Sequence, residues 1–351
     1  MEQAVGLQSS RVTNLVQSNP FPGQLTKLFR DDYILVQTVA VALNPTDWKH
    51  IDFLSSPGAL VGCDYAGIVK AVGPAVMKTF KEGDRVCGCA HGSNSGQHED
   101  GTFAEYIVAK GDLQMHIPDQ LSFEEAATLG VGVVTVGQGL YEALQLPLPS
   151  EPSKEKIPIL IYGGSSSTGS LGIQFAKLSG YDLITTCSPH NFDLVKSLGA
   201  VAAFDYKDPK SVAKIRNYTS DNINLAWDTI SLESSAKFCA DVLSPTGGKY
   251  ACLLDVKAPR NDVETIMTSA YTAFGEPFEF GPDTIPAIPE RFEFAKNWVK
   301  AVEQLLFAGK IKVPKPKIGK DGLNGVLNGL QLLRENKVSG EKLVYRVNET
   351  R

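Results

Sequence analysis

The feature that most constrains the fold is a series of short apolar segments that alternate with helical patterns between residues 157 and 254. Their composition is typical of strands buried on both faces, as in a parallel sheet covered by helices. Helical patterns at 169–178 and 191–198 end at Gly180 and Gly199, as helices commonly do. The nearly continuous apolar runs are 157–162, 183–187, 202–205, 225–228 and 249–254. This region is therefore predicted to form a doubly wound α/β domain.

A turn of small residues joins the first strand of this series to the first helix. Free backbone N–H groups and the helix dipole favour an anion there, and only small side chains let a pyrophosphate approach the backbone. The best register is Gly163-x-x-Ser166-x-x-Gly169, so the usual three-glycine pattern is altered. Taken alone, the turn is equally compatible with a structural loop. Within a βαβαβ series it predicts a dinucleotide site.

The segment after the next strand bears on which nicotinamide cofactor would bind. An NAD enzyme normally carries Asp or Glu there to hold the ribose 2′-hydroxyl. Residues 187–191 contain no carboxylate, and Tyr206 and Lys207 follow one strand later. These groups favour NADP(H). Ser188 and Pro189 also suit a helix start, since Ser is a good N-cap, and both interpretations can hold together.

The regions on either side of this series are predicted to be mainly β-structure. Strands are expected at 33–41, 64–73 and 101–108, a turn enters another strand at 81–86, and the last strand lies at 341–347. A capping box of Ser122 and Glu125 predicts a helix through Leu129. Aromatic and aliphatic residues at helical spacing predict an amphipathic helix at 294–305, whose aromatics we interpret as core.

Chain length, net charge and the distribution of cysteines limit the classes of protein to which this chain can belong. The chain has 351 residues, about twice a usual domain, and a formal charge of −5 that argues against a nucleic-acid footprint. Six scattered cysteines indicate reduced, mostly buried thiols. Residues 1–6 show no signal-peptide pattern, and glycines interrupt the apolar stretch 129–146, so no membrane span is predicted. These features predict a cytoplasmic protein.

Several motifs carry a resemblance to a known superfamily. Asn44-Pro45-Thr46-Asp47 resembles the N-P-x-D element of the medium-chain dehydrogenase/reductases. Further matching motifs are 62–69, 83–86, 101–106, the turn 163–169 and 196–200. Within the superfamily, residues 186–193 and 339–344 look most like the fungal trans-acting enoyl reductases of polyketide synthases, of which the lovastatin enoyl reductase is an example.

The resemblance implies an inserted arrangement of domains. A GroES-like catalytic domain would consist of residues 1–126 and 287–351, and a Rossmann NADPH-binding domain of residues 127–286 would be inserted in it. The active cleft would lie between them. The cofactor-binding residues predicted from the turn, the strand ends and the resemblance are Thr46, Asp47, Trp48, Lys49, Thr135, Ser165, Ser166, Ser167, Thr168, Ser188, Pro189, His190, Asn191, Tyr206, Leu253, Leu254, Leu343 and Val344.

A substrate pocket also follows from the resemblance. The glycines at 130–137 would leave room for an acyl chain; the alternative for Thr135 and its neighbours is plain helix packing, in which glycines allow close approach. The predicted substrate-binding residues are Val131, Gly132, Val133, Val134, Val136, Gly137, Phe274, Gly275, Glu276, Pro277 and Phe278. Lys49 is the candidate for polar assistance in catalysis, with a surface lysine on a turn as the alternative.

Zinc is not expected. Catalytic zinc needs three protein ligands of N, S or O type. The first ligand position of zinc-dependent relatives falls in Asn44-Pro45-Thr46, and their His-Glu pair is replaced by Cys63-Asp64. The remaining cluster, Cys87-x-Cys89-x-His91 with His98, has irregular spacing and is interpreted as a solvated loop.

The activity that the resemblance implies is hydride transfer from NADPH to the β-carbon of an α,β-unsaturated acyl thioester. The cofactor carries the chemistry, so the protein need supply only binding, orientation and electrostatics. The partner would be the acyl carrier protein of a polyketide synthase, or of a synthase–peptide synthetase hybrid, that lacks its own active enoyl reductase. We expect a monomer with no nucleic-acid or membrane partner. The alternatives are a stand-alone NADPH quinone or alkenal reductase and a catalytically silent NADPH-binding protein.

Overall fold

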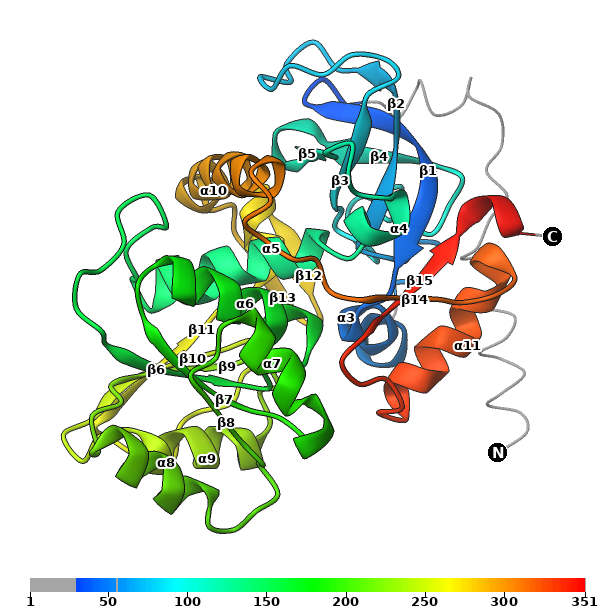
Figure 1. Ribbon diagram of the computed structural model, residues 1–351. Coiled ribbons are helices and arrows are strands. Elements are labelled where there is room, and N and C mark those ends of the chain that lie inside the picture. Colours follow the sequence, from blue (N-terminus) through cyan, green and yellow to red (C-terminus); the bar gives the residue numbers. More distant parts are fainter. Residues whose placement is uncertain (1–29, 55, 351) are drawn as a thin grey trace, which may run out of the picture. The chain divides into compact units, whose positions relative to one another are not determined.

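A computed structural model describes residues 30–54 and 56–350, which form two compact units (Figure 1). Unit 1 comprises the described residues up to Val131 together with those from Tyr271 onward, and unit 2 comprises Gly132–Ala270. The chain thus leaves unit 1 and later returns to it. The expected division had its boundaries at residues 126/127 and 286/287, which lie five residues before the first crossing and sixteen residues after the second.

Unit 1 is built on a seven-stranded sheet. Neighbouring strands in this sheet are antiparallel, except that the edge strand β14 (Pro316–Ile318) runs parallel to β15 (Lys342–Arg346). The order continues from β15 through β1 (Tyr33–Ala42), β2 (Asp64–Val72), β3 (Arg85–Cys89) and β5 (Met115–His116), with β4 (Tyr106–Lys110) paired to β1. The central strand β1 therefore joins the early part of the chain to the late part.

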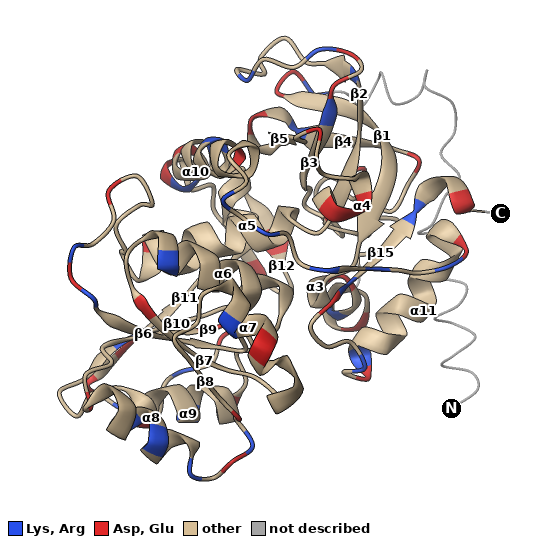
Figure 2. Cartoon of the chain, viewed as in Figure 1, with Lys and Arg blue, Asp and Glu red and all other residues tan. Residues whose placement is uncertain are grey.

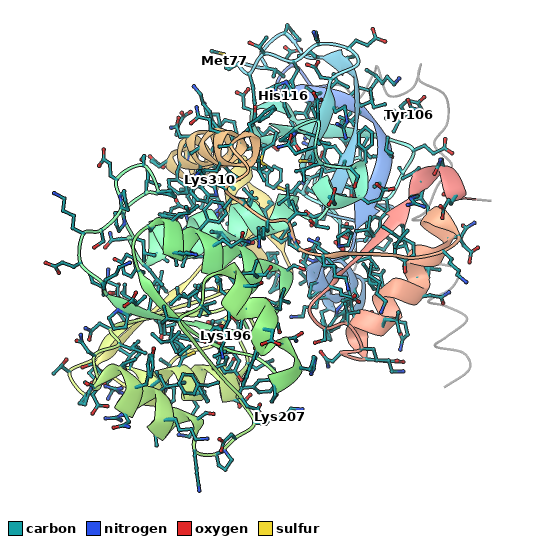
Figure 3. The ribbon with its side chains drawn as sticks, viewed as in Figure 1. Met77, Tyr106, His116, Lys196, Lys207 and Lys310 are labelled. Atoms are coloured by element: carbon teal, nitrogen blue, oxygen red, sulfur yellow. The ribbon has the colours of Figure 1, made fainter. Side chains whose placement is uncertain are left out.

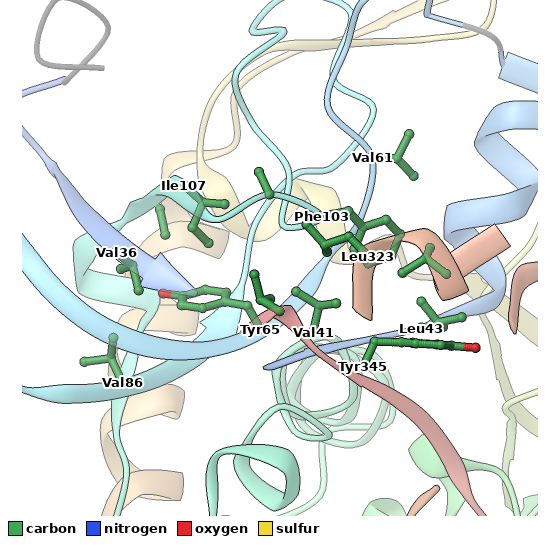
Figure 4. Close-up of a cluster of buried hydrophobic side chains, with 14 of the residues drawn as sticks. Val36, Val41, Leu43, Val61, Tyr65, Val86, Phe103, Ile107, Leu323 and Tyr345 are labelled. Carbon is green, nitrogen blue, oxygen red and sulfur yellow. The ribbon is translucent and has the colours of Figure 1, made fainter. Parts of the chain in front are cut away.

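The core of unit 1 lies against this sheet (Figure 4). Tyr65 is fully buried there, and its hydroxyl donates to the side-chain oxygen of the buried Gln114 at 2.9 Å. The apolar side chains around it come from segments far apart in the sequence: Val36, Val41, Leu43, Val61, Val86, Phe103, Ile107, Leu323 and Tyr345. Burial of these residues ties α11 (Gly322–Arg334) and β15 to the first strands.

The helices of unit 1 are short, apart from α10 (Pro289–Phe307) and α11. The remaining elements are α3 (Pro45–Lys49), a π-helix (His50–Leu54), η2 (Gly111–Leu113), α4 (Phe123–Ala126), η5 (Ala270–Phe274), β12 (Phe278–Phe280), β13 (Asp283–Ile285) and η6 (Val347–Glu349). Two of these helices cross a boundary: α5 (Gly130–Val136) begins in unit 1 and continues into unit 2, and η5 begins at Ala270 of unit 2 and continues into unit 1.

Two expectations for unit 1 are wrong in detail. Residues 102–105 form bends instead of strand, because the backbone N–H groups of Thr102 and Phe103 both donate to the carbonyl of Val61. A Cβ at Gly101 would also lie 2.4 Å from the carbonyl oxygen of Leu60. The helix expected over 122–129 is α4 alone, since a separate helix begins at Gly130.

Unit 2 is the predicted parallel α/β domain. Its sheet has the order β11 (Val263–Met267), β10 (Gly248–Cys252), β9 (Leu225–Asp228), β6 (Pro158–Tyr162), β7 (Asp182–Thr186) and β8 (Ala202–Phe204). All five pairings are parallel, and the strand order reverses at β6, as in dinucleotide-binding folds. Its helices are η3 (Gly137–Ala143), α6 (Ser167–Leu178), η4 (Pro189–Asn191), α7 (Phe192–Leu198), α8 (Ser211–Thr219) and α9 (Glu233–Val242).

Trp227 in β9 fixes how closely two helical segments approach this sheet. The indole is fully buried. A Cβ at Gly139 would lie 2.3 Å from the nearest indole atom, and a Cβ at Gly172 would lie 2.4 Å from its own nearest indole atom. Both positions must therefore be glycine for η3 and α6 to pack on this ring.

All six cysteines are free and buried, as the sequence predicted. Over the described part of the chain, no helix has both the length and the apolar character needed to cross a membrane.

Candidate functional site

The phosphate turn, residues 163–169, lies in unit 2 between β6 and α6. The hydroxyl of Ser166 accepts the backbone N–H of Gly169 at 2.9 Å, so Ser166 is the N-cap of α6. The first residues after a cap have no intrahelical acceptor for their N–H groups, and Ser167 and Thr168 occupy these positions. Both are half-buried, as is Ser165. The turn thus presents donors and a helix N-terminus where an anion would bind.

Two glycines allow this turn to form. Gly163 has φ of +83°, a conformation that favours glycine. A Cβ at Gly169 would lie 2.3 Å from the carbonyl oxygen of Gly163, so any larger residue would force the turn open. These two residues occupy the glycine positions of the altered pattern. The residues of the turn therefore fit a dinucleotide pyrophosphate.

Thr229 contacts this turn, and sequence reasoning missed it. Its hydroxyl donates to the carbonyl of Tyr162 at 2.9 Å and lies 3.1 Å from the hydroxyl of Ser166. Next to it, the buried carboxylate of Asp228 accepts the N–H groups of Ile230 and Ser231 and the hydroxyl of Tyr250. These contacts support the turn from the neighbouring strand. The sequence feature that could have indicated this contact is a carboxylate, Asp228, at the end of a predicted strand.

The carboxyl ends of β7 and β8 carry the residues predicted to select the cofactor. Ser188 precedes η4 and is half-buried, Pro189 and His190 are exposed, and the buried Asn191 precedes α7. Tyr206 and Lys207 follow β8 and are exposed, with the ammonium of Lys207 5.7 Å from the Tyr206 ring centroid. Figure 3 shows Lys207 at the surface of unit 2.

Leu253 and Leu254, also predicted to contact the cofactor, follow β10 and are half-buried. The N–H of Leu253 donates to the Ser231 hydroxyl at 2.8 Å. Val133, Val134, Thr135, Val136 and the glycines Gly132 and Gly137 are buried in unit 2 on α5 and the start of η3, while Val131 is half-buried at the edge of unit 1. Little of their side-chain surface is exposed.

In unit 1, a turn followed by α3 carries the motif 44–49. The backbone N–H of Asn44 donates to a carboxylate oxygen of Asp47 at 2.7 Å, which forms a capping box. Asp47 is 2% exposed. Burial raises its pKa to about 7, the Asp64 charge adds to the rise, and the Asn44 N–H and Lys342 oppose it. The Asp47 side chain thus holds the turn together from inside.

Trp48 and Lys49 complete the motif. Both are half-buried, with the Lys49 ammonium 5.8 Å from the Trp48 ring centroid. Burial lowers the pKa of Lys49, which makes the group easier to deprotonate than an exposed lysine. The guanidinium of Arg334 lies 5.7 Å from the same indole and pairs with Asp52 at 2.8 Å.

Thr46 belongs to a chain of hydrogen-bonding groups that the sequence did not reveal. Its hydroxyl lies 2.6 Å from the Tyr271 hydroxyl and 3.1 Å from Nδ1 of His50. Burial raises the pKa of Tyr271 well above its ordinary value and lowers that of His50. At neutral pH the tyrosine therefore keeps its proton and the imidazole is neutral.

Aromatic rings surround this chain of groups. The imidazole of His91 stacks on Tyr271 with ring centroids 4.3 Å apart, and burial lowers its pKa to about 3. We call the whole group the aromatic cluster: His50, His91, Tyr271, Phe274, Phe278 and Phe280. Two predicted substrate residues, Phe274 and Phe278, thus belong with Thr46 in unit 1.

The other predicted substrate-binding residues of segment 274–278 have different surroundings. Gly275 has φ of +67°, and Pro277 is exposed. Glu276 forms ion pairs with Lys110 and with Arg30, the latter at 3.8 Å. Glu276 thereby connects the segment to β4.

A buried ion pair lies at the start of the motif 44–49. The Lys342 ammonium pairs with Asp64 and donates to the side-chain oxygen of Asn44 at 3.1 Å. Asp64 also accepts the Asn44 amide at 2.8 Å and the backbone N–H of Val131 at 2.6 Å. The Lys342 ammonium thus contacts Asn44 and Asp64. In the sequence analysis, these two residues fall at positions where zinc-dependent relatives carry metal ligands.

Leu343 and Val344, predicted cofactor contacts, follow Lys342 in β15 and have buried side chains. The carbonyl of Leu343 accepts the N–H of Leu43 at 3.0 Å, which fixes β15 beside the turn.

The cysteine–histidine segment gives no support to a metal site. The interpretation of this segment as a solvated loop is wrong for three of its four residues. Cys87 and Cys89 are buried in β3, where burial raises the pKa of Cys87 to about 12, and His91 is buried in the aromatic cluster. His98 is exposed. Within residues 30–54 and 56–350, no group of three or more His, Cys, Asp or Glu is placed to hold a metal ion. Function without zinc stays a prediction.

Comparisons with known proteins agree with this architecture. Residues 30–119 match the family model described as the alcohol dehydrogenase GroES-like domain, and residues 167–253 match that described as zinc-binding dehydrogenase. The crystal structure of CurK enoyl reductase has a TM-score of 0.70 and covers 90% of this chain and 91% of its own, at 19% identity, a level that bears on the fold alone.

Curated relatives are much more similar. The trans-enoyl reductase resD of Aspergillus sclerotiorum is 52% identical over 349 residues, covering 95% of this chain and 96% of its own length. The trans-enoyl reductase TOXD of Cochliobolus carbonum is 59% identical over 275 residues, or 78% of this chain and 93% of its own. The chain therefore belongs to the medium-chain dehydrogenase/reductase superfamily and, within it, to the fungal trans-enoyl reductases.

Proposed function

We propose that this chain uses NADPH to reduce the carbon–carbon double bond of an α,β-unsaturated polyketide acyl thioester, presented by an acyl carrier protein in the cytoplasm. The observation that carries the proposal is similarity to curated trans-enoyl reductases over nearly the whole chain. The partner is a polyketide synthase, alone or joined to a peptide synthetase, that lacks an active enoyl reductase. The protein acts as a monomer.

Enzymes of this family use a nicotinamide cofactor, which supplies the hydride when bound. The phosphate turn fits its pyrophosphate, as described above. Ser188 and His190, with Tyr206 and Lys207 one strand further on, offer hydroxyl, imidazole and ammonium groups instead of a carboxylate. A carboxylate would repel a 2′-phosphate, whereas these groups can donate to it. This supports NADPH over NADH.

The residues of unit 1 would act on the acceptor. Reduction at the β-carbon develops negative charge on the thioester oxygen, which hydrogen-bond donors stabilise. Tyr271 and Thr46 form a pair of hydroxyls in a largely apolar aromatic setting. Because Tyr271 remains protonated, the pair always has a proton available to donate. Lys49 is the cationic group on the same short helix.

The proposal is tested by following NADPH oxidation with three acceptor sets. These are α,β-unsaturated acyl-pantetheines, the same acyl groups on a carrier protein, and free enals and quinones. We expect turnover of the thioesters, with NADPH preferred to NADH. Equal or faster reduction of free enals or quinones would favour a stand-alone reductase. Tight NADPH binding without turnover of any acceptor would identify a silent binding protein.

A further inference from the structure

Five lysines occur within eleven residues of unit 1, at positions 310, 312, 315, 317 and 320. No Asp or Glu lies between the first and the last of them, although the chain as a whole carries a formal charge of −5. Blue stretches mark this segment between α10 and β15 in Figure 2. We call these five side chains the basic strip. Such a concentration of one sign is unusual in an acidic chain and calls for a physical explanation.

The backbone of the segment holds these lysines outward. Ile311 and Pro314 are buried and anchor it, whereas all five lysines are exposed, as Lys310 is in Figure 3. Lys315 and Lys317 share the one carboxylate of Glu341, at 2.7 and 3.5 Å. This pairing offsets only part of the local positive charge.

The basic strip is also close in the sheet to predicted site residues. Its Lys317 lies in β14, the edge strand, in which Lys317 pairs with Leu343 and Ile318 with Val344. Those two partners are predicted cofactor contacts, and Leu343 is hydrogen-bonded to Leu43, next to the turn 44–49. Part of the basic strip therefore lies on the strand directly paired with the one that carries predicted cofactor contacts.

We propose that the basic strip is the docking surface for an acidic face of the partner that delivers the acyl chain. This rests on the proposed function, in which that partner is the carrier protein. Opposite charges steer encounter and fix orientation. Lysines and prolines on an edge strand also prevent another strand from adding to it, so the contact is made by ammonium groups instead of by backbone pairing.

The test compares two substrates on two variants of the full chain. The first variant carries Lys310→Glu, Lys312→Glu and Lys320→Glu, which spares the pairs with Glu341. The matched control carries Lys154→Glu, Lys156→Glu and Lys237→Glu, three exposed lysines of unit 2 with the same total charge change. Each is assayed with one unsaturated acyl group on pantetheine and on a carrier protein.

For the strip variant we expect kcat/KM with the carrier-bound substrate to fall at least about tenfold, while kcat/KM with acyl-pantetheine stays within twofold. Added salt should slow the unmodified protein with the carrier-bound substrate and leave the strip variant nearly unaffected. The control variant should behave as the unmodified protein. Equal losses on both substrates, or no loss on either, would overturn the docking role.

Direct binding separates this proposal from the proposed function. The affinity of the carrier protein for each variant is measured by calorimetry without any turnover. If no thioester is reduced, the proposed function fails, while weaker carrier binding by the strip variant alone still supports docking. Carrier binding that is unchanged by the strip variant, or binding of phosphatidylserine vesicles in its place, would contradict it.

Discussion

The Lys342 ammonium and the Asp64 carboxylate form an ion pair whose side chains are 2% and 0% exposed. Each also has hydrogen-bonding partners, among them Asn44, which begins the motif 44–49, and the N–H of Val131, at the start of α5. One buried pair thus connects two segments that carry predicted site residues with the strand β15. Its energetics can be tested directly.

Lys342→Met should destabilise the protein strongly, because it leaves the Asp64 charge buried without its partner. Removing one member of a buried pair costs about 3–5 kcal/mol, which urea unfolding of the variant would measure. Replacing both residues, Lys342→Met with Asp64→Leu, should recover much of the loss. A double variant that loses the sum of the two single losses would show that the residues do not act as a pair.

Asp47 should make stability depend on pH. Its pKa is raised to about 7 in the folded protein from about 3.9 when unfolded, so folding favours the protonated form. The contribution of Asp47 to the free energy of unfolding is therefore fully present below pH 4, and this contribution is lost as the pH rises to 7. Relative to Asp47→Asn, which keeps an acceptor for Asn44, the unfolding free energy should fall by roughly 4 kcal/mol over that range. Parallel stability curves for the two proteins would exclude this.

Tyr271→Phe should impair turnover more than folding. The variant removes the hydroxyl that contacts Thr46 and keeps the ring that stacks on His91. Loss of one hydrogen bond of about 1 kcal/mol predicts a decrease of roughly tenfold or less in kcat/KM. Since the pKa of Tyr271 lies well above its ordinary value, the pH profile between 6 and 9 should keep its shape. Unaltered kcat/KM would show that Tyr271 serves packing alone.

Ser188→Asp should change the cofactor preference. A carboxylate after β7 would hold a ribose 2′-hydroxyl and repel a 2′-phosphate, so the ratio of kcat/KM for NADPH over NADH should fall by at least about tenfold. Ser188→Ala is the matched control, because it removes the hydroxyl without adding charge. A ratio that is unchanged in the aspartate variant would place the 2′-phosphate elsewhere.

The parallel sheet of unit 2 could be predicted because its signal is local. Each strand from β6 to β10 belongs to a nearly continuous apolar run, and the glycine turn stands directly after the first. The strands of unit 1 were harder to predict from the sequence. Residues 101–105 have strand-like composition, yet Gly101 approaches Leu60 closely and hydrogen bonds to Val61 bend the residues that follow. No pattern in their own sequence encodes those contacts.

The groups missed at the site are those assembled from distant positions. Lys342 stands in an alternating strand, where a lysine normally faces solvent, and only the tertiary fold brings Asp64 to it. Tyr271 follows no motif and meets Thr46 across 225 residues. The motif 44–49 itself was recognisable because its residues are contiguous.

The way β15 pairs with β1 also sets the order in which the units can be completed on the ribosome. Unit 2 is one continuous stretch, Gly132–Ala270, so its sheet can close while translation continues. Unit 1 cannot, because Asn44 and Lys342 are 298 residues apart and β1 awaits its late neighbour. The nascent chain must therefore carry an unfinished sheet, with an open edge and an unpartnered Asp64, at a stage when unit 2 is complete enough to fold.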